Sequence, residues 1–250
     1  MIWITSLALA AEPTFHWDPA VDVPVTLGSG GVWFLMYANV EDGLSPAGAV
    51  ANPTGPDALL APRYNSSFGT TSDVLLYGSI GTGLGLAVLD GALDGEGAHT
   101  RAFLVVESFA LNQFATTTLK LAVDRPRPYT ALGAGYSDEV DELLGEKDSE
   151  MSFPSGHTST VAQMAFVTAR IYDLSGATRP QRIGAYSLAT AATVAAGSLR
   201  VGAGVHHPTD VVAGALLGGC IGFLVPTVHV TDRRVSVAAT TNSVALSTSW

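Results

Sequence analysis

Long apolar segments rich in small residues occupy most of the chain after residue 70. Their periodicity predicts five helices, at residues 72–91, 99–122, 157–173, 181–199 and 209–228. Three of these segments contain runs of 16 to 18 residues without any charge. Such runs are close to the roughly 20 residues that a membrane-spanning helix needs. Their Gly, Ala, Ser and Thr content favours close contacts between helices.

The two ends of the chain follow other patterns. Residues 1–11 are apolar and end in an Ala-x-Ala motif, which is typical of a signal peptide or an anchor, but they carry no Lys or Arg. A buried N-terminal segment or a truncated start is the alternative. Prolines and acidic residues predict a loop over 12–27, a short helix fits 28–41, and 42–70 reads as a long connection. Alternating residues in 233–250 predict a small β-hairpin, with a loose C-terminus as the alternative.

These elements predict an all-α fold, a helical bundle of five to six helices followed by a short C-terminal β-hairpin. The bundle spans a membrane if its apolar helices face lipid. We divide the chain into a signal-like or anchor segment (1–11), a loop-rich region with one short helix (12–70), the helical bundle (71–230) and a C-terminal tail (231–250).

Composition narrows the class of protein. Only 14% of the 250 residues are charged, against about 25% in an ordinary soluble domain. Hydrophobic residues reach 47% and the mean hydropathy is +0.32, as in a membrane protein or a soluble protein with unusually apolar helices. A net charge of −10 argues against a nucleic-acid partner. The single cysteine, Cys220, excludes an internal disulfide and a cysteine-based zinc site, and its apolar surroundings predict a buried thiol.

A basic cluster marks the end of the 99–122 helix. Lys120 lies in the last turn, and Arg127 follows seven residues later between two prolines. The prolines end the helix and stiffen the segment that carries Arg127. Cations also stabilise helix C-termini, so capping alone would explain this cluster.

The motif Pro154-Ser-Gly-His157 opens the next helix. Ser155 fits the N-cap position, and Gly156 permits close approach to the free backbone amides, which favour an anion. His157 falls in the first turn and is aimed at whatever binds there. An ordinary N-cap with an uninvolved histidine is the alternative.

A third cluster joins the last two helices. Arg200 ends one helix, and His206 and Asp210 bracket the start of the next. Their spacing of four lets the Asp210 carboxylate accept a hydrogen bond from the imidazole. That bond would fix the tautomer and leave the other ring nitrogen as a nucleophile. A structural hydrogen bond is the alternative, and His207 is interpreted as a bystander.

All three clusters fall at helix ends that meet on one side of an up-and-down bundle. Three cations would converge there with two histidines and an aspartate. The cations repel one another unless an anion with several oxygens lies between them. Phosphate fits this requirement, because Arg binds it through two parallel hydrogen bonds and Lys as a point charge.

Taken together, the clusters resemble the signature of the type 2 phosphatidic acid phosphatase superfamily, which includes lipid phosphate phosphatases, bacterial class A acid phosphatases and vanadium-dependent haloperoxidases. The first cluster has the family's spacing of Lys, six residues and Arg-Pro, and the second matches Pro-Ser-Gly-His in full. The third has the spacing of Arg, five residues, His, three residues and Asp. It departs from the family at Leu199, where the family has a serine.

The resemblance implies a role for each site residue. His206 attacks phosphorus and forms a phosphohistidine, Asp210 holds His206, and His157 protonates the leaving group. The oxygens of the phosphate are held by Lys120, Arg127, Arg200, Ser155 and Gly156. No metal and no cofactor are expected, because the cations supply the charge that a metal would bring and the sequence shows no compact carboxylate or Cys/His cluster. Arg125, inside the first cluster, is expected to be structural.

Loop charges predict which side of a membrane the site faces. Five arginines lie around the loop opposite the site or after the last helix, at Arg170, Arg179, Arg182, Arg233 and Arg234. By the positive-inside rule this side is cytoplasmic, so the site faces the periplasm of a bacterial-type inner membrane. The acidic connection near 90–100 weakens this orientation. The short apolar runs and Glu107 in mid-helix favour the alternative of a soluble periplasmic enzyme.

The leading hypothesis is a phosphatase that acts on a phosphorylated small molecule, either a phosphomonoester or a lipid (pyro)phosphate. A soluble non-specific acid phosphatase, a vanadate-dependent haloperoxidase and a non-catalytic anion-binding membrane protein are the alternatives. The loops at 42–70 and 129–152 are expected to set the substrate. No feature of the sequence indicates an oligomeric state.

Overall fold

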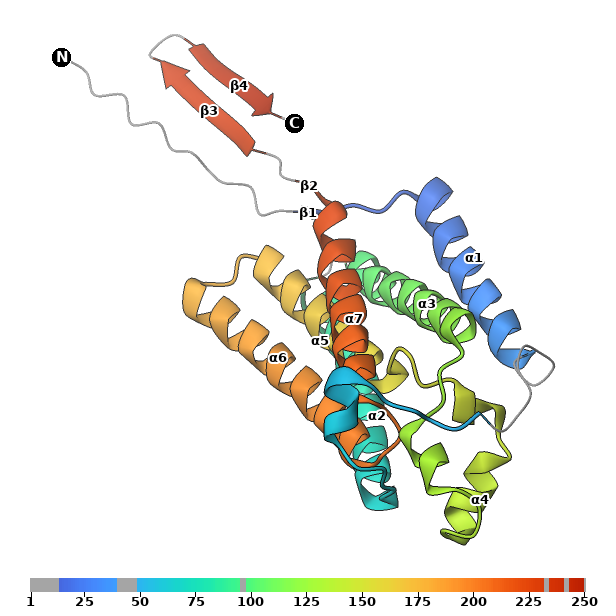
Figure 1. Ribbon diagram of the computed structural model, residues 1–250. Coiled ribbons are helices and arrows are strands. Elements are labelled where there is room, and N and C mark those ends of the chain that lie inside the picture. The colour runs from blue at the N-terminus through green and yellow to red at the C-terminus, as the bar shows by residue number, and fades with distance from the viewer. Residues whose placement is uncertain (1–13, 40–48, 95–97, 232–233, 241–242, 250) are drawn as a thin grey trace.

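The computed structural model describes residues 14–39, 49–94, 98–231, 234–240 and 243–249 (Figure 1). Within this part of the chain, α-helices form a bundle, with the bounds α1 Pro19–Ala38, α2 Ser66–Asp94, α3 Ala98–Val123, α4 Asp138–Leu144, α5 Gly156–Leu174, α6 Arg179–Gly202 and α7 Pro208–Val228. Single 3-10 turns lie in the connections, at η2 Gly55–Leu59, η3 Pro128–Leu132 and η4 Lys147–Glu150. The predicted all-α bundle is confirmed. The signal-like segment 1–11 lies outside the described residues.

The N-terminal half of α1 differs from the prediction. Residues 19–27 are helical, although their prolines predict a loop. Asp18 caps this helix by accepting a hydrogen bond from the Ala20 amide at 2.9 Å, and Pro19 occupies the first turn, where it needs no amide partner. Pro24 also falls early in the helix. The short helix α4, in the predicted irregular stretch 129–152, is a further addition.

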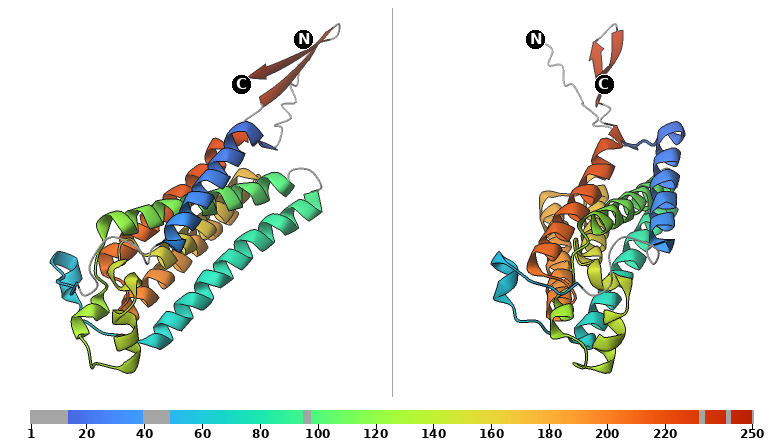
Figure 2. Two further views of the ribbon diagram at one scale, coloured as in Figure 1. Left: turned by 90° about the vertical axis from the view of Figure 1, so that its right-hand side faces the viewer. Right: turned by 45° about the vertical axis from the view of Figure 1, so that its right-hand side comes forward.

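Two antiparallel strand pairs lie at the end of the bundle away from α4 (Figures 1 and 2). The strand β1, Thr14–Phe15, pairs with β2, Val230–Thr231, and so joins the two ends of the described bundle. The strands β3, Arg234–Thr240, and β4, Ser243–Ser249, form the predicted C-terminal hairpin.

The helices α5 and α7 are packed backbone against backbone. Three glycines spaced by four, Gly214, Gly218 and Gly222, form one face of α7. A Cβ added to Gly218 would lie 1.9 Å from the Ser159 carbonyl oxygen, and one added to either other glycine would lie 2.5 Å from a carbonyl oxygen of α5. Only glycine permits this approach, which is the small-residue contact that the composition of these helices predicts.

Buried polar side chains connect α3 to α5. Three hydrogen bonds of 2.7 to 3.0 Å form a ladder, between Gln163 and Ser108, Ser159 and Asn112, and Thr160 and Gln113. The expected polar face of α3 therefore meets protein rather than lipid. An apolar cluster around Met164, Val105 and Val167 completes this part of the core.

The outside of the bundle is strongly apolar. Segments 66–89 and 208–228 are long and apolar enough to cross a membrane, yet only 17% and 28% of their apolar windows are buried within the bundle. They are therefore not core helices of the kind found in soluble proteins. Cys220 is exposed, so the prediction of a buried thiol is wrong. The glycine face of α7 packs on α5, and Cys220, two residues from Gly218, lies on the other face.

The glycine contact yields a stability prediction. Gly218→Ala is expected to destabilise the protein by about 3 kcal/mol or more, because the new methyl group overlaps the α5 backbone, which cannot rotate away. Gly219→Ala is the matched control, since its Cβ would make ordinary contact with Phe166 at 3.8 Å. Thermal unfolding in detergent measures both, and equal unfolding temperatures for the two variants would contradict the packing argument.

Candidate active site

The C-terminal ends of α3 and α6 and the N-terminal ends of α5 and α7 lie at the same end of the bundle (Figure 1). The three predicted clusters are therefore brought together. The backbone amide of Ser155, at the start of α5, donates to the carbonyl oxygen of Asp210, in the first turn of α7, at 3.0 Å. This bond joins the second cluster directly to the third.

His206 lies at the centre of the site and is almost completely buried. Its Nδ1 lies 2.7 Å from the carbonyl oxygen of Ser152, an acceptor, so Nδ1 carries the proton. Nε2 then carries a lone pair, and this atom lies 3.3 Å from Nη1 of Arg127. Burial, followed by the charges of Arg127, Arg200 and Lys120, lowers the pKa of His206 well below its usual 6.5. The imidazole is therefore neutral at physiological pH, which is the form a nucleophile needs.

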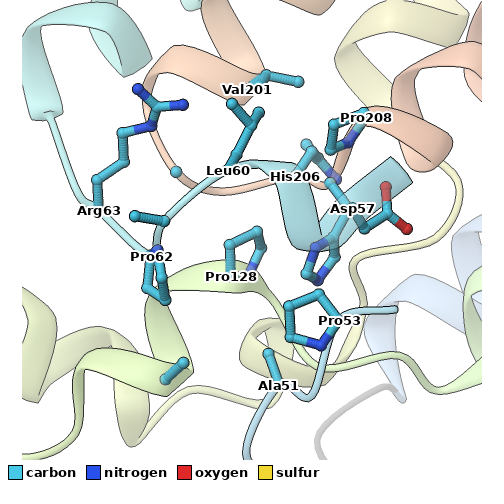
Figure 3. Close-up of a pocket in the computed structure, with 14 residues that line it drawn as sticks. Ala51, Pro53, Asp57, Leu60, Pro62, Arg63, Pro128, Val201, His206 and Pro208 are labelled. Carbon is cyan, nitrogen blue, oxygen red and sulfur yellow. The ribbon is translucent and has the colours of Figure 1, made fainter. Parts of the chain in front are cut away.

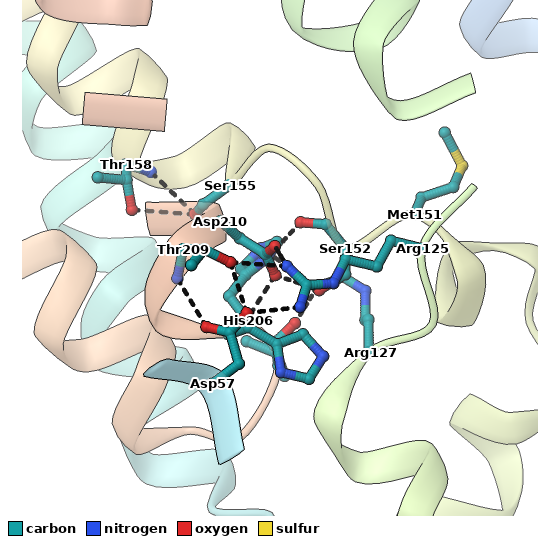
Figure 4. A network of polar contacts seen from close by, with 12 residues as sticks. Asp57, Arg125, Arg127, Met151, Ser152, Ser155, Thr158, His206, Thr209 and Asp210 are labelled. Atoms are coloured by element: carbon teal, nitrogen blue, oxygen red, sulfur yellow. Dashed lines mark hydrogen bonds and ion pairs between the residues drawn. The ribbon is translucent and has the colours of Figure 1, made fainter. Parts of the chain in front are cut away.

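Asp210 holds His206 differently from the prediction. Its Oδ2 lies 3.6 Å from Nδ1 of His206, too far for the expected direct hydrogen bond. The carboxylate instead accepts from the Ser152 hydroxyl at 2.5 Å, the His207 amide at 2.8 Å and Arg125 Nη1 at 2.5 Å (Figure 4). Because Asp210 folds back over the first turn of α7, Ser152 lies between the two side chains and contacts both.

Arg125 bridges this carboxylate to a second one. Its Nη2 donates to Asp57 in η2 at 2.6 Å, and Asp57 also accepts from the amide and hydroxyl of Thr209, at 2.9 and 2.6 Å. Burial alone would raise the pKa of Asp57, but the hydrogen bonds from Arg125 and Thr209 outweigh it and lower that pKa. Arg125 was expected to be structural, and in the structure its hydrogen bonds hold the Asp210 carboxylate in place. The sequence contains no signal that Asp57 belongs here.

Lys120 and Arg127 converge as predicted. Lys120 Nζ donates to the Met151 carbonyl oxygen at 3.0 Å, and Arg127 Nε donates to that of Asp148 at 2.7 Å. Both cations face the Asp148 carboxylate, at 3.9 Å from Lys120 and 2.6 Å from Arg127. Burial would raise the pKa of Asp148, but these two charges lower it to about 2. Asp148 lies in the acidic stretch before α5, within the 129–152 loop that is expected to set the substrate, but the sequence does not single out this residue.

Arg200 is the third cation, and it is buried. Its Nε has no hydrogen-bond partner among the described residues. Its Nη1 lies 3.7 Å from Asp73, beyond hydrogen-bond distance. A buried N–H without a partner costs about 1–3 kcal/mol. An anion seated beside Arg200 would remove that cost.

His157 has a partner that sequence analysis missed. Its Nε2 lies 2.7 Å from Oδ1 of Asp73, which comes from α2 and is half-exposed. A contact this short is typical of a charge-assisted hydrogen bond, so Asp73 favours the protonated form of His157. Burial and the charge of Arg200 outweigh this contact and lower the pKa of His157 to about 4. Asp73 stands in the apolar helix α2, far from the three clusters in sequence, so short-range spacing gives no signal for it.

Ser155 is the N-cap of α5, as predicted, and its Oγ accepts from the Thr158 amide at 3.4 Å. The hydroxyl is therefore used by the cap in this structure. Gly156 lies against Lys120, since a Cβ added there would meet the Lys120 side chain at 3.6 Å. His207 is the N-cap residue of α7, and its Nε2 lies 3.2 Å from the Pro126 carbonyl oxygen, in keeping with a bystander.

A small pocket lies beside His206, between residues 51–63 and the turn before α7 (Figure 3). Its walls include Pro53, Asp57 and Leu60. Gly204, with φ of 75°, permits this close packing, because a Cβ there would lie 1.7 Å from the Arg63 carbonyl oxygen. Residues 51–63 of the 42–70 connection thus contribute to the surroundings of the site, and the control of substrate choice by this connection stays a prediction.

The site brings three fixed cations together beside a buried histidine, an arrangement that suits an anion with several oxygens. The model of the PAP2 superfamily matches residues 101–234, more than half of the chain. The chain belongs to the PAP2 superfamily and is a phosphoric ester hydrolase.

The solved structures that are similar to this chain include a transmembrane PAP2-type phosphatidylglycerolphosphate phosphatase from Bacillus subtilis. The two share 23% sequence identity and a TM-score of 0.48, over 84% of this chain and 94% of the other. No curated protein sequence matches the chain.

The lowered pKa of His206 predicts how stability depends on pH. An unfolded histidine, with a pKa of about 6.5, binds a proton that folded His206 does not, so stability falls as pH decreases from about 6.5 toward 5. His206→Gln cannot titrate and is expected to lose less stability over this range. Thermal unfolding at pH 7.5 and 5.5 measures the difference, with the exposed His99→Gln as control. An equally steep loss in His206→Gln would refute the assignment.

Proposed function

We propose that the protein hydrolyses a lipid phosphate monoester or diphosphate through a phosphohistidine on His206, at a site that faces the periplasm. The observation that carries this proposal is the buried, neutral His206. Its Nδ1 is bound by Ser152, and its Nε2 lies beside Arg127. The unpartnered Nε of Arg200 belongs to the same set of cations and suits an oxygen of phosphate.

The first step transfers the phosphoryl group to the enzyme. The Nε2 lone pair of His206 forms a bond to phosphorus while the bridging P–O bond breaks. The electron pair leaves with the bridging oxygen, which belongs to the alcohol of a monoester or to the remaining phosphate of a diphosphate. His157 donates its proton to that oxygen, so the alcohol departs neutral. Lys120, Arg127 and Arg200 stabilise the charge on the three other phosphate oxygens.

The second step releases phosphate. A water molecule attacks phosphorus and gives its proton to His157, which is now neutral, while the P–N bond breaks and its electron pair returns to His206. Asp73 stabilises the protonated form of His157 in both steps. Ser152, held by Asp210, keeps the Nδ1 proton of His206 in place, so Nε2 is restored as the nucleophile.

A lipid substrate is supported by the outer surface of the bundle. Large apolar side chains are exposed along α1, α2, α6 and α7, including Phe34, Val74, Leu188 and Leu216. Lipid is the solvent that suits such a surface. Arginines around the α5–α6 connection, at the end away from the site, support a cytoplasmic position for that end and a periplasmic position for the site.

Catalysis is tested by phosphate release from purified protein in detergent, in short assays with EDTA present. Phosphatidic acid, an isoprenoid diphosphate and an aryl phosphate are offered as substrates. His206→Ala is expected to lower turnover by about 10⁴-fold or more, because the nucleophile is lost. Wild-type protein without activity on any of them would contradict the proposal, and bromide oxidation with added vanadate and peroxide would then indicate a haloperoxidase. A preference for the aryl phosphate over both lipids would instead favour the soluble acid phosphatase.

The role of His157 predicts a dependence on the leaving group. His157→Ala is expected to lose about 10²–10⁴-fold in rate on an alkyl phosphate, whose alkoxide needs a proton as it leaves. The loss on 4-nitrophenyl phosphate should be much smaller, because nitrophenolate leaves without one. Equal losses on both substrates would mean that His157 is not the general acid. His207→Gln serves as the matched control and should retain activity on both.

Membrane orientation is tested by cysteine labelling in a Cys220→Ser background, which has no other cysteine. Tyr136→Cys lies in the exposed loop at the site end, and Ala177→Cys lies in the α5–α6 connection. A membrane-impermeant maleimide applied to intact spheroplasts should label only the first variant. Labelling of the second alone would reverse the orientation, and labelling of both would favour a soluble protein.

A further inference from the structure

A second polar cluster lies toward the end of the bundle that carries the β1–β2 pair, where the start of α1 and the end of α7 lie beside α3. It consists of Asp22 from the first turn of α1, Glu107 from α3, and His229, which follows the last residue of α7. One ligand atom from each of the three lies within 4.8 Å of the others. The residues are 85 and 122 positions apart, so no sequence motif contains them.

The three side chains face one another without hydrogen bonds between them. Nε2 of His229 lies 3.4 Å from Oδ1 of Asp22 and 3.6 Å from Oε2 of Glu107. Charge-assisted hydrogen bonds are much shorter, at about 2.7–2.9 Å. Oε2 of Glu107 has no hydrogen-bond partner among the described residues, although the side chain is only 4% exposed. A buried carboxylate oxygen in this state is costly unless a positive charge reaches it.

The other polar atoms of His229 and Asp22 make hydrogen bonds to the backbone, and these bonds fix the orientation of both side chains. Nδ1 of His229 lies 2.7 Å from the Val225 carbonyl oxygen, so Nδ1 carries the proton and Nε2 presents a lone pair to the carboxylates. The second oxygen of Asp22 accepts from the Asp18 amide at 2.6 Å. Histidines that bind metals usually donate their other N–H to a carbonyl or carboxylate in this manner, which fixes the ring.

The two distances from His229 to the carboxylates match the edges of a metal coordination sphere. Zinc binds histidine nitrogen and carboxylate oxygen at about 2.0–2.2 Å. In a tetrahedron with such bonds, neighbouring ligand atoms lie about 3.3–3.6 Å apart. The two contacts of His229, at 3.4 and 3.6 Å, fall within that range.

We propose that Asp22, Glu107 and His229 bind one divalent transition-metal ion of the zinc type. The ion binds N and O donors from three helices and neutralises the two buried carboxylates. It fixes the start of α1 against α3 and the end of α7, next to the β1–β2 pair. The site is separate from the hydrolytic site and serves stability rather than catalysis.

The test measures metal content and unfolding of the full chain in detergent. Protein stripped with a chelator and reloaded with Zn²⁺ is expected to retain about one equivalent after gel filtration. Its unfolding temperature should rise by about 5 °C or more over the stripped protein, and Mg²⁺ should give a much smaller rise. Reloading with Co²⁺ should give the visible absorption of a bound ion.

Variants locate the ion. Glu107→Gln and His229→Gln are each expected to weaken Zn²⁺ binding by at least about tenfold. The exposed His99→Gln, at the same end of the bundle, and His206→Ala, in the other site, should bind as wild type does. No stoichiometric metal in the wild-type protein, or the same content in all variants, would overturn the proposal. Chelation that leaves unfolding unchanged would instead identify a buried ion pair with protonated His229. The wild-type measurements decide the matter even if a variant fails to fold.

Discussion

The rest of the structure depends on the backbone contact between α5 and α7. Because three glycines remove every side chain from one face of α7, the two helices approach until Cβ atoms would no longer fit. At the site end, this contact leaves the Ser155 amide bonded to the Asp210 carbonyl oxygen. The first turn of α5, with His157, is thereby held against the first turn of α7 and the turn that carries His206. A wider helix separation would place the two histidines on separate surfaces.

Electrostatics then determines what the site can hold. Lys120, Arg127 and Arg200 are brought together beside a neutral histidine, and carboxylates at the open edge balance part of their charge. Asp148 faces the first two cations and Asp73 faces the third. Asp210, in contrast, is fully buried and its hydrogen bonds come from Ser152, the His207 amide and Arg125. The carboxylates thus divide into those that face the cations and one that supports His206 from behind.

Polar side chains are part of the interior of the bundle, and large apolar side chains cover much of its outside. Hydrogen-bonded amides and hydroxyls connect α3 and α5 in the interior, while leucine, valine and phenylalanine side chains cover α2 and α7 outside. Each end of the bundle carries its own charged cluster. The cluster around His206 is rich in cations, and the one around His229 is rich in carboxylates, which is why an anion suits one end and a metal ion the other.

The sequence by itself determined the helical bundle and its C-terminal hairpin, because periodicity is a local property. The spacing within its three clusters gave the family resemblance, and that resemblance implies the proposed roles of Lys120, His157, Arg200 and His206. Helix alternation was enough to predict that these residues meet at one end.

Tertiary structure alone decided which side chains support them. Asp57, Asp73 and Ser152 come from other segments, and no local pattern marks them. The same holds for Asp22, Glu107 and His229, whose contact depends on three helices packing at fixed depths. The fold also decided which group binds Nδ1 of His206. A spacing of four residues permits a hydrogen bond to Asp210. The path of the chain before α5 instead places the Ser152 carbonyl oxygen closer to Nδ1.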